Sequence, residues 1–356
     1  MASPVERAER AEERLVEPLG HARRMRELVR SAARERLPHA LLFTGASGIG
    51  KYLSARWLAC ALLCTADDVE ARPCGACPGC RQFVTANHLD VYAIDEEGER
   101  IPLKKIAYRP GHDEAETIEA ERFLGTRASA GGWRVVLVRD AERMTDEAQN
   151  AMLKMLEEPG RKALWLLTTS RPQALLSTVR SRCIAVPFDA LSAEDCATVL
   201  ARHGYAPADA KALAVWGHGS PGRSLALAER SAGDLRALLG GVFTGAAAPL
   251  DASRALMQVE GEFSGSTPLQ QARDRARTVL ELALEIAGDA LRLSSGVPLE
   301  RLVHVDLLAG LPGGFLAAQA PRLARKLEGL LETRADIDKN LDPQSVLDRA
   351  CLTLAP

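Results

Sequence analysis

The sequence is poor in aromatic residues and has almost no excess charge, and each absence excludes a class of protein. Only 4% of its 356 residues are Phe, Trp or Tyr, which argues against the stacking platforms of single-strand-binding domains. Lys and Arg number 45 against 47 Asp and Glu, a net charge of −2. A protein that holds nucleic acid by bulk positive charge is therefore not expected, although a local basic patch is compatible with this balance.

Long apolar runs are also absent. No segment approaches the ~18 consecutive apolar residues of a membrane span, and the start, Met1–Pro4 followed by alternating Glu and Arg, has no apolar signal-peptide core. We therefore expect a soluble, cytoplasmic protein with no membrane contact. Hydrophobic residues at 47% and charged residues at 26% are the balance of a globular protein, and the length fits two or three domains.

The eight cysteines do not form the dense framework of a small secreted protein. Four of them are clustered, with gaps of nine, two and two residues: Cys64, Cys74, Cys77 and Cys80. Two C-x-x-C units with Pro and Gly turns suit a closed tetrahedral Zn²⁺ site, so a structural zinc module is predicted at residues 64–80. An iron–sulfur cluster would want a further cysteine at position 84, which is Val84. A redox pair would use a single C-x-x-C at a helix start, whereas this chain has three cysteines in two successive C-x-x-C units.

The remaining cysteines are predicted to be packing residues: Cys60, Cys183, Cys196 and Cys351. Cys60 lies one helical turn before the first ligand, where a small buried apolar side chain fits better than a fifth ligand. His88 follows the cluster closely, but four thiols already complete a tetrahedral site.

Short apolar runs alternate with helical segments over residues 38–188, which is typical of a parallel α/β sheet. The predicted strands are 40–44, 91–94, 134–138, 164–169 and 184–186, and the predicted helices here are 5–36, 53–63 and 146–158. The charged residues 95–117 predict an exposed excursion. From Ser192 onward helical periodicity replaces the strand pattern, and Gly240-Gly241 indicates a second boundary between residues 230 and 245.

A glycine-rich loop follows the first predicted strand and precedes a helix: Gly45-Ala46-Ser47-Gly48-Ile49-Gly50-Lys51. This is the context of a P-loop, in which backbone N–H groups cradle phosphates and the lysine reaches the outer ones. The next residue is Tyr52, although a working P-loop needs Ser or Thr there to bind Mg²⁺. A phenol on a rigid ring cannot take that place.

The second magnesium determinant is expected at the end of a later strand, and residues 135–138 run into Arg139-Asp140. The usual pattern has Asp at the first of these positions, where this chain has Arg139; Asp140 can stand in for the acidic residue that follows. Two departures at Mg²⁺ ligands predict severely impaired ATP hydrolysis. For the loop itself two alternatives stay open: weak binding of ATP or ADP, or a remnant that only packs as a tight turn.

Several short motifs occur in a fixed order between residues 38 and 227, about half of the chain. They are Pro38-His39-Ala40-Leu41-Leu42-Phe43 before the phosphate loop, the four-cysteine module, Gly131-Gly132-Trp133-Arg134-Val135-Val136, Asn150-Ala151-Met152-Leu153-Lys154-Met155-Leu156-Glu157-Glu158-Pro159, Ser181-Arg182-Cys183 and Gly219-Ser220-Pro221-Gly222-Arg223. In this combination they resemble the bacterial DNA polymerase III clamp-loader subunits of the AAA+ class, most closely the delta-prime type. Residues 337–343 loosely resemble the last helices of that family.

The resemblance implies three domains. These are an AAA+ α/β domain with an inserted zinc module at 1–188, a small helical lid at 189–235 and a helical collar for oligomerisation at 236–356. The fold class expected is therefore α/β plus all-α.

The resemblance also implies roles for single residues. Arg182 matches the family's arginine finger, which enters the ATP site of a neighbouring subunit. Arg223 matches the sensor-2 arginine of the lid, and Thr168 or Thr169 falls at the sensor-1 position. Without magnesium ligands, the nucleotide-binding positions of this chain are expected to bind ATP or ADP weakly or not at all.

The function implied is that of a delta-prime-type subunit. It helps load the sliding clamp onto primed DNA, does not hydrolyse ATP itself, and donates its arginine to a neighbour. The expected partners are gamma/tau-type and delta-type subunits, with the clamp and primed DNA reached through the complex. The chain would be a component of a DNA-directed DNA polymerase, a nucleotidyltransferase, with no catalytic activity of its own.

Two alternatives stay open. One is an ATP-hydrolysing gamma/tau-type motor subunit, against which Tyr52 and Arg139 argue. The other is a zinc-dependent DNA-binding module with a decayed nucleotide domain, which the near-neutral charge disfavours.

Overall fold

The computed structural model describes residues 16–95, 100–107, 119–129, 132–308, 313–337 and 341–356. These form two compact units, Met1–Arg223 and Ser224–Pro356, which are described separately. The division falls within helix α11 (Pro221–Glu229). In the described part of the chain, no helix combines the length and the apolar character needed to cross a bilayer. Predictions that fall on residues 1–15, Gly131 and 338–340 lie outside the described residues.

The first unit is built on a parallel five-stranded sheet with the order β2-β3-β4-β1-β5. Its strands are β1 (Ala40–Thr44), β2 (Val91–Ile94), β3 (Arg134–Val138), β4 (Ala163–Thr169) and β5 (Ile184–Pro187). Leu42 of β1 lies opposite Leu167 of β4 on one side and Ala185 of β5 on the other. Every residue of β4 is buried, as expected for a strand covered on both faces. The predicted parallel sheet and its five strands are confirmed.

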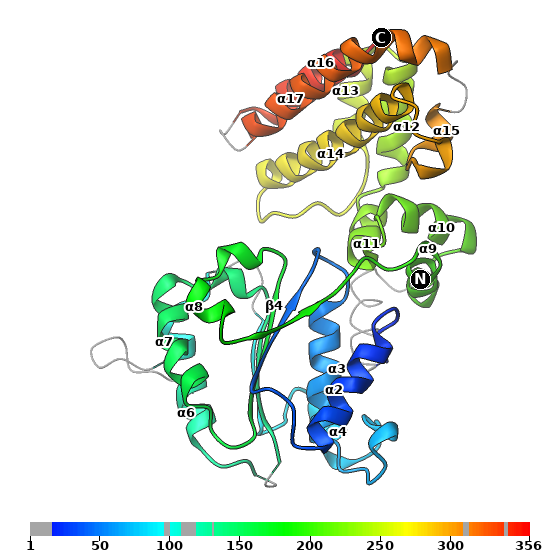
Figure 1. Cartoon of the computed structure of the whole chain (residues 1–356). Coiled ribbons are helices and arrows are strands. Elements are labelled where there is room, and N and C mark those ends of the chain that lie inside the picture. The colour runs from blue at the N-terminus through cyan, green and yellow to red at the C-terminus, as the bar shows by residue number, and fades with distance from the viewer. Residues whose placement is uncertain (1–15, 96–99, 108–118, 130–131, 309–312, 338–340) are drawn as a thin grey trace. The chain divides into compact units, whose positions relative to one another are not determined.

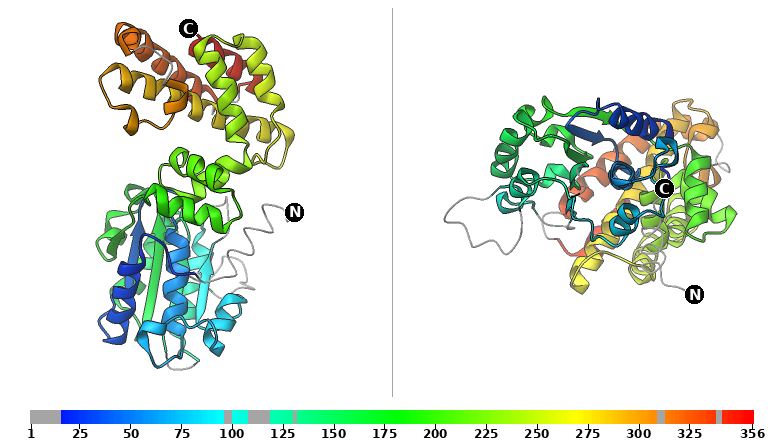
Figure 2. Two further views of the ribbon diagram at one scale, coloured as in Figure 1. Left: turned by 90° about the vertical axis from the view of Figure 1, so that its right-hand side faces the viewer. Right: turned by 90° about the horizontal axis from the view of Figure 1, so that it is seen from below.

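Helices cover both faces of this sheet (Figures 1 and 2). Successive strand residues point to opposite faces, so Leu41 and Phe43 pack into one core layer while Leu42 and Trp165 pack into the other. On the first face lie α2 (Ala22–Ala33), α3 (Lys51–Leu63) and α4 (Pro78–Val84). On the second lie α5 (Leu103–Ile106), α6 (Ala120–Gly125), α7 (Asp146–Glu157) and α8 (Ser177–Arg180). The unit continues into α9 (Ala193–Arg202) and α10 (Pro207–Trp216).

The carboxyl ends of parallel strands meet at one edge of a sheet. The glycine-rich loop follows β1 at this edge, Asp95 follows β2, Arg139 and Asp140 follow β3, and Ser170 follows β4. Residues far apart in the sequence are therefore placed around the loop.

The helix predicted over residues 5–36 is shorter in its described part. It begins at Ala22 and ends at Ala33. Before it, the N–H of His21 donates to the carbonyl of Pro18 and Gly20 adopts a φ of +72°, a backbone conformation that a continuing helix cannot have.

The exposed excursion predicted over residues 95–117 is wrong at Ile101 and Ile106, whereas Asp95, Arg100 and Lys104 are exposed as predicted. Ile101 and Ile106 are buried in the second core layer. The N–H of Ile101 donates to the carbonyl of Arg143, and its own carbonyl accepts from the N–H of Thr145. The partners of Ile101 lie about forty residues further along the chain, so no local sequence pattern predicts its burial. The remainder of the range lies outside the described residues.

The second unit is helical, as the change of pattern after Ser192 predicts. After α11 come α12 (Ala232–Thr244), α13 (Pro249–Gln258), α14 (Pro268–Ser294), α15 (Val305–Leu308), α16 (Gly313–Ile337) and α17 (Pro343–Leu354). The buried Arg236 ties α12 to the α15 region: it donates from Nε to His304 Nδ1 at 2.8 Å and from Nη1 to Asp306 Oδ2 at 2.8 Å.

Gly240 and Gly241 do not interrupt the helix, because α12 runs through both residues. A Cβ at Gly240 would lie 2.6 Å from Leu307 Cδ2, so the glycine permits close packing within the unit. The division into 1–188, 189–235 and 236–356 stays a prediction, and its second boundary falls inside α12.

Candidate functional site

The glycine-rich loop forms the tight turn that its sequence predicts between β1 and α3. Gly45, Gly48 and Gly50 have φ values of +150°, +75° and +90°, in the region that side chains other than glycine's rarely adopt. A Cβ at Gly45 would lie 2.3 Å from the carbonyl oxygen of Phe188. Ile49 is 2% exposed and packs into the first core layer. The loop is therefore held at the carboxyl edge of the sheet by its glycines and by one apolar anchor.

The loop lysine is bonded to the loop itself. Lys51 Nζ donates to the carbonyls of Gly45 at 2.8 Å and Ala46 at 2.6 Å. Its side chain is 6% exposed, and burial lowers the pKa of Lys51 while Asp140 and Glu142 oppose that shift. The ammonium is thus largely buried and satisfied by backbone oxygens.

The start of α11 is seated on the same loop, within the first unit. The hydroxyl of Ser220 donates to the carbonyl of Ser47 at 2.9 Å, and the N–H of Gly222 donates to the carbonyl of Gly48 at 2.9 Å. A Cβ at Gly48 would lie 2.6 Å from Ser220 Oγ. The N–H of Arg223 in turn donates to Ser220 Oγ at 3.3 Å. The motif that carries the predicted sensor-2 arginine therefore contacts the predicted phosphate loop.

The two positions predicted to lack magnesium ligands contact one another. The guanidinium of Arg139 lies over the ring of Tyr52, 5.6 Å from its centroid, and its Nε is 3.8 Å from Asp140 Oδ2. The phenol of Tyr52 donates to Asp95 Oδ2 at 2.9 Å, and burial raises the pKa of Tyr52, which keeps it a donor. A protein cation and a phenol stand where a hydroxyl and a carboxylate are needed. These residues therefore do not fit Mg²⁺.

The predicted sensor-1 residues are buried and bonded within the protein. Thr168 and Thr169 are 1% and 0% exposed. Thr168 Oγ1 accepts from the N–H of Asp140 at 3.1 Å, and Thr169 Oγ1 accepts from the N–H of Arg171 at 3.0 Å. Both hydroxyls thus fix the chain at the ends of β3 and β4.

Glu142 is a residue for which sequence reasoning proposed no role. Its side chain is 3% exposed and accepts from the N–H and the hydroxyl of Ser170 at 3.1 and 2.8 Å. Burial opposes its ionisation, but these hydrogen bonds hold the pKa of Glu142 below its usual value. In the sequence, Glu142 could have been noticed as an acidic residue three positions after Arg139, close to the end of the third strand.

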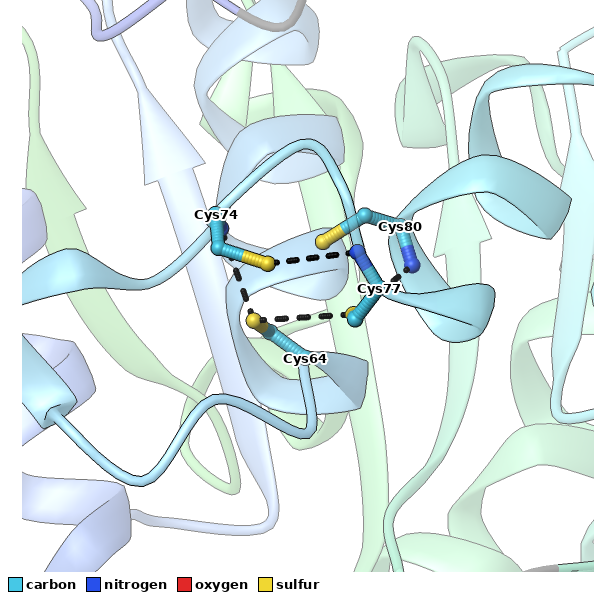
Figure 3. Close-up of side chains that lie close together, drawn as sticks. All are labelled: Cys64, Cys74, Cys77 and Cys80. Carbon is cyan, nitrogen blue, oxygen red and sulfur yellow. Dashed lines mark hydrogen bonds between the residues drawn. The ribbon is translucent and has the colours of Figure 1, made fainter.

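The four clustered cysteines meet as their spacing predicts (Figure 3). Their sulfur atoms all lie within 4.8 Å of one another. Cys64 follows α3, Cys74 lies in the connecting loop, Cys77 caps the start of α4 and Cys80 lies within that helix. The structure thus brings together the four cysteines that were predicted as the ligand set.

Backbone amides point at three of these four sulfurs. The N–H groups of Cys74, Cys77 and Cys80 donate to the sulfurs of Cys64, Cys74 and Cys77, each at 3.4 Å. Although burial opposes it, hydrogen bonds from Cys80 and Thr65 lower the pKa of Cys77 to about 6. Thiolates in a closed tetrahedral set are the donors that structural Zn²⁺ prefers. The four residues therefore fit a zinc ion, for which they would supply all four ligands.

The other cysteines are packing residues, as predicted. All four are buried: Cys60, Cys183, Cys196 and Cys351. Burial raises the pKa of the Cys60 thiol to about 12. His88 accepts from the N–H of Asp90 through Nδ1 at 3.1 Å.

Two arginines of α2 fasten the cysteine module to the unit. Arg26 Nη1 donates to the carbonyls of Glu70 at 2.6 Å and Arg72 at 2.9 Å, and its guanidinium lies 5.0 Å from the ring centroid of Trp57. Arg30 pairs with the Glu70 carboxylate through Nε and Nη2, at 2.6 and 2.9 Å. Arg26 and Arg30 of this helix therefore do not only face solvent, because they bind the loop that carries the cysteine ligands.

Arg182 lies between α8 and the edge strand β5. Its side chain is 35% exposed. Nη1 donates to the carbonyl of Thr178 at 3.0 Å, and Nη2 lies 2.5 Å from Glu157 Oε1. The residue is thus accessible and held on its own chain by two contacts.

The fold and the site define a phosphate-loop α/β domain with an added cysteine module. Residues 20–192 match the family described as DNA polymerase III, delta subunit. The predicted resemblance to clamp-loader subunits is confirmed over this region.

Proteins named DNA polymerase III subunit delta' are similar to this chain. That of Bacillus subtilis is 31% identical over 190 residues, 53% of this chain and 54% of its own length. That of Escherichia coli is 35% identical over 202 residues, 56% of this chain and 58% of its own length. The tau subunit of E. coli is 33% identical over 165 residues, 45% of this chain and 23% of its own. The chain therefore matches little more than half the length of these delta' relatives.

Among solved structures, a DNA polymerase III gamma subunit-related protein from Thermotoga maritima aligns with a TM-score of 0.38 and 17% identity. That alignment covers 93% of this chain and 98% of the other.

Proposed function

We propose that this chain is the delta-prime-type subunit of a DNA polymerase III clamp loader of the AAA+ class, located in the cytoplasm. It assembles with gamma/tau-type and delta-type subunits and helps load the sliding clamp onto primed DNA. It does not hydrolyse ATP and lends Arg182 to the ATP site of a neighbouring subunit. The family match over residues 20–192 and the relatives named delta' support this assignment.

One observation carries the proposal: Arg139 is packed on Tyr52 at the two positions where Mg²⁺ ligands are needed. Without the ion, the charge that develops on the transferred phosphoryl group is poorly neutralised. Lys51, bonded to its own loop, and Ser220, seated on that loop, are consistent with a nucleotide site that has become structural.

Arg182 supplies the complementary half of the mechanism. A guanidinium is charged at every physiological pH and donates in a planar fork that matches phosphate oxygens. Placed against a neighbour's ATP, it stabilises the transition-state charge; arginine fingers of other enzymes accelerate phosphoryl transfer ~10³–10⁵-fold.

The domain roles follow from the same proposal. The lid comprises residues 189–235, and residues 236–356 form the collar through which the subunits assemble. Cys64, Cys74, Cys77 and Cys80 hold a structural zinc ion that stabilises the loop between α3 and β2.

ATP turnover tests the proposal, first with the purified chain and then in the assembled loader. We expect no Mg²⁺-dependent hydrolysis by the chain alone, and slowed hydrolysis by a loader that contains Arg182→Ala and still assembles. Arg180→Ala is the matched control, because Arg180 is an exposed arginine two residues earlier. Normal turnover with Arg182→Ala would remove the finger role.

The gamma/tau-type motor is the second candidate, since the E. coli tau subunit also matches this chain. Substantial hydrolysis by the isolated chain would favour it over the delta-prime assignment.

A further inference from the structure

The contact between Arg182 and Glu157 indicates a role for Glu157, and this inference rests on the proposed function of Arg182. Glu157 is the last residue of α7, and its carboxylate accepts from Nη2 of Arg182 at 2.5 Å. Together with the carbonyl of Thr178, it uses two of the five N–H donors of the guanidinium. Within the described part of the chain, this leaves three donors for an anion that approaches the exposed part of the side chain.

Helix α7 and the turn before it contact the segment that leads to Arg182 at several points. Glu142 accepts from the residue that follows β4, and Gln149 Oε1 accepts from the N–H of Leu176 at 2.8 Å. Both are buried, since the Glu142 side chain is 3% exposed and Gln149 is 1% exposed. Glu157 contacts Arg182 further along the chain, at the solvent-accessible end of the helix.

A carboxylate at this end of a helix is not explained by helix stability. The last turn carries partial negative charge from the backbone dipoles, which favours Lys or Arg over Glu. The Arg182 guanidinium supplies the missing positive charge. In return, the ion pair and the Thr178 carbonyl restrict an arginine that otherwise samples many rotamers.

We infer that Glu157 is a positioning residue for Arg182: it holds the guanidinium at the end of α7, oriented for a phosphate group of a neighbouring subunit. Glu157 does not itself touch that phosphate. Its effect is therefore exerted only through Arg182.

The test uses the assembled loader with gamma/tau-type subunits and measures the kcat and KM of ATP hydrolysis. Glu157→Ala is expected to lower kcat about two- to fivefold, the range that an exposed ion pair provides, with KM unchanged because the finger acts in the transition state. Glu157→Asp should restore part of the loss. Glu158→Ala, at the adjacent exposed carboxylate, is the matched control and should leave kcat unchanged.

A double-mutant cycle separates positioning from a structural effect. Adding Glu157→Ala to Arg182→Ala should lower kcat no further, and the melting temperatures of the variants show that each is folded. An equal loss of kcat in both backgrounds, or an unchanged or raised kcat in Glu157→Ala alone, overturns the positioning role while the proposed function stands. Failure of Arg182→Ala itself to slow hydrolysis removes the finger role within the proposed function, and the positioning role with it.

Discussion

Replacing Gly48 by alanine tests whether the start of α11 is seated on the phosphate loop. The added Cβ would lie 2.6 Å from Ser220 Oγ and 2.9 Å from the backbone nitrogen of Arg223. The second contact is with backbone, so no side-chain rotation relieves it. The φ of +75° at this position adds conformational strain for any residue other than glycine.

Gly50→Ala is the matched control. Gly50 also has a left-handed backbone, with φ +90°, but a Cβ there meets nothing within 4 Å. The control therefore carries only the backbone strain, about 1–2 kcal/mol. Gly48→Ala carries that strain and an overpacking penalty of about 1–3 kcal/mol. We expect the Gly48→Ala chain to be less stable than the Gly50→Ala chain by this second amount.

Tryptophan fluorescence during urea unfolding measures this difference in unfolding free energy for the first structural unit, which contains Gly48 and Gly50. All four tryptophans, Trp57, Trp133, Trp165 and Trp216, lie in the unit Met1–Arg223. Hydrogen exchange at residues 219–223 should also rise in Gly48→Ala and not in Gly50→Ala. Equal free energies of unfolding for the two variants would refute the seating of Ser220 and Gly222 on the loop.

Three further predictions concern the other parts of the chain. Cys74→Ser should reduce bound zinc, measured by elemental analysis, from about one per chain to well below it, and make residues 64–84 sensitive to proteolysis; undiminished zinc would contradict the four-thiolate site. A double-mutant cycle of Tyr52→Leu and Arg139→Ala should give a coupling of about 0.5–1 kcal/mol in urea unfolding, whereas strict additivity would mean that the stacked pair does not form in solution. The hydrogen bonds from Arg236 hold the pKa of Asp306 below its usual value, so the carboxylate stabilises the fold above about pH 4 and this contribution is lost as the pH falls through the lowered pKa. The stability difference between the parent chain and Asp306→Asn, followed by far-ultraviolet circular dichroism, should therefore shrink from pH 7 to pH 3; a constant difference would exclude this contribution.

The sheet was predictable because its determinants are local. The strand at 40–44 is a short apolar run that ends in glycines, and β4 is apolar along most of its length. The glycine-rich loop and the cysteine module were predictable for a related reason, since each depends on residue types at fixed spacing along one short segment. The helix at 5–36 was predicted too long, because charge and apolar content alone do not mark where Gly20 turns the chain.

Burial of Ile101 and the continuity of α12 through Gly240 could not be predicted. The first depends on pairing with Met144, and the second on packing against Leu307. Neither partner is close in the sequence, so no periodicity records the contact.

The sequence by itself determined the parallel sheet, the glycine-rich loop and the four clustered thiols, and placed Tyr52 and Arg139 where magnesium ligands are expected, because all of these are matters of residue type and local order. Only the tertiary structure decided that Arg139 packs on Tyr52, that Ser220 reaches the loop 173 positions away, and that Arg182 is held by Glu157. Such contacts arise where parallel strands bring their carboxyl ends to one edge and where helices pack across the sheet. Their partners are set by the topology of the chain, which a local pattern does not contain.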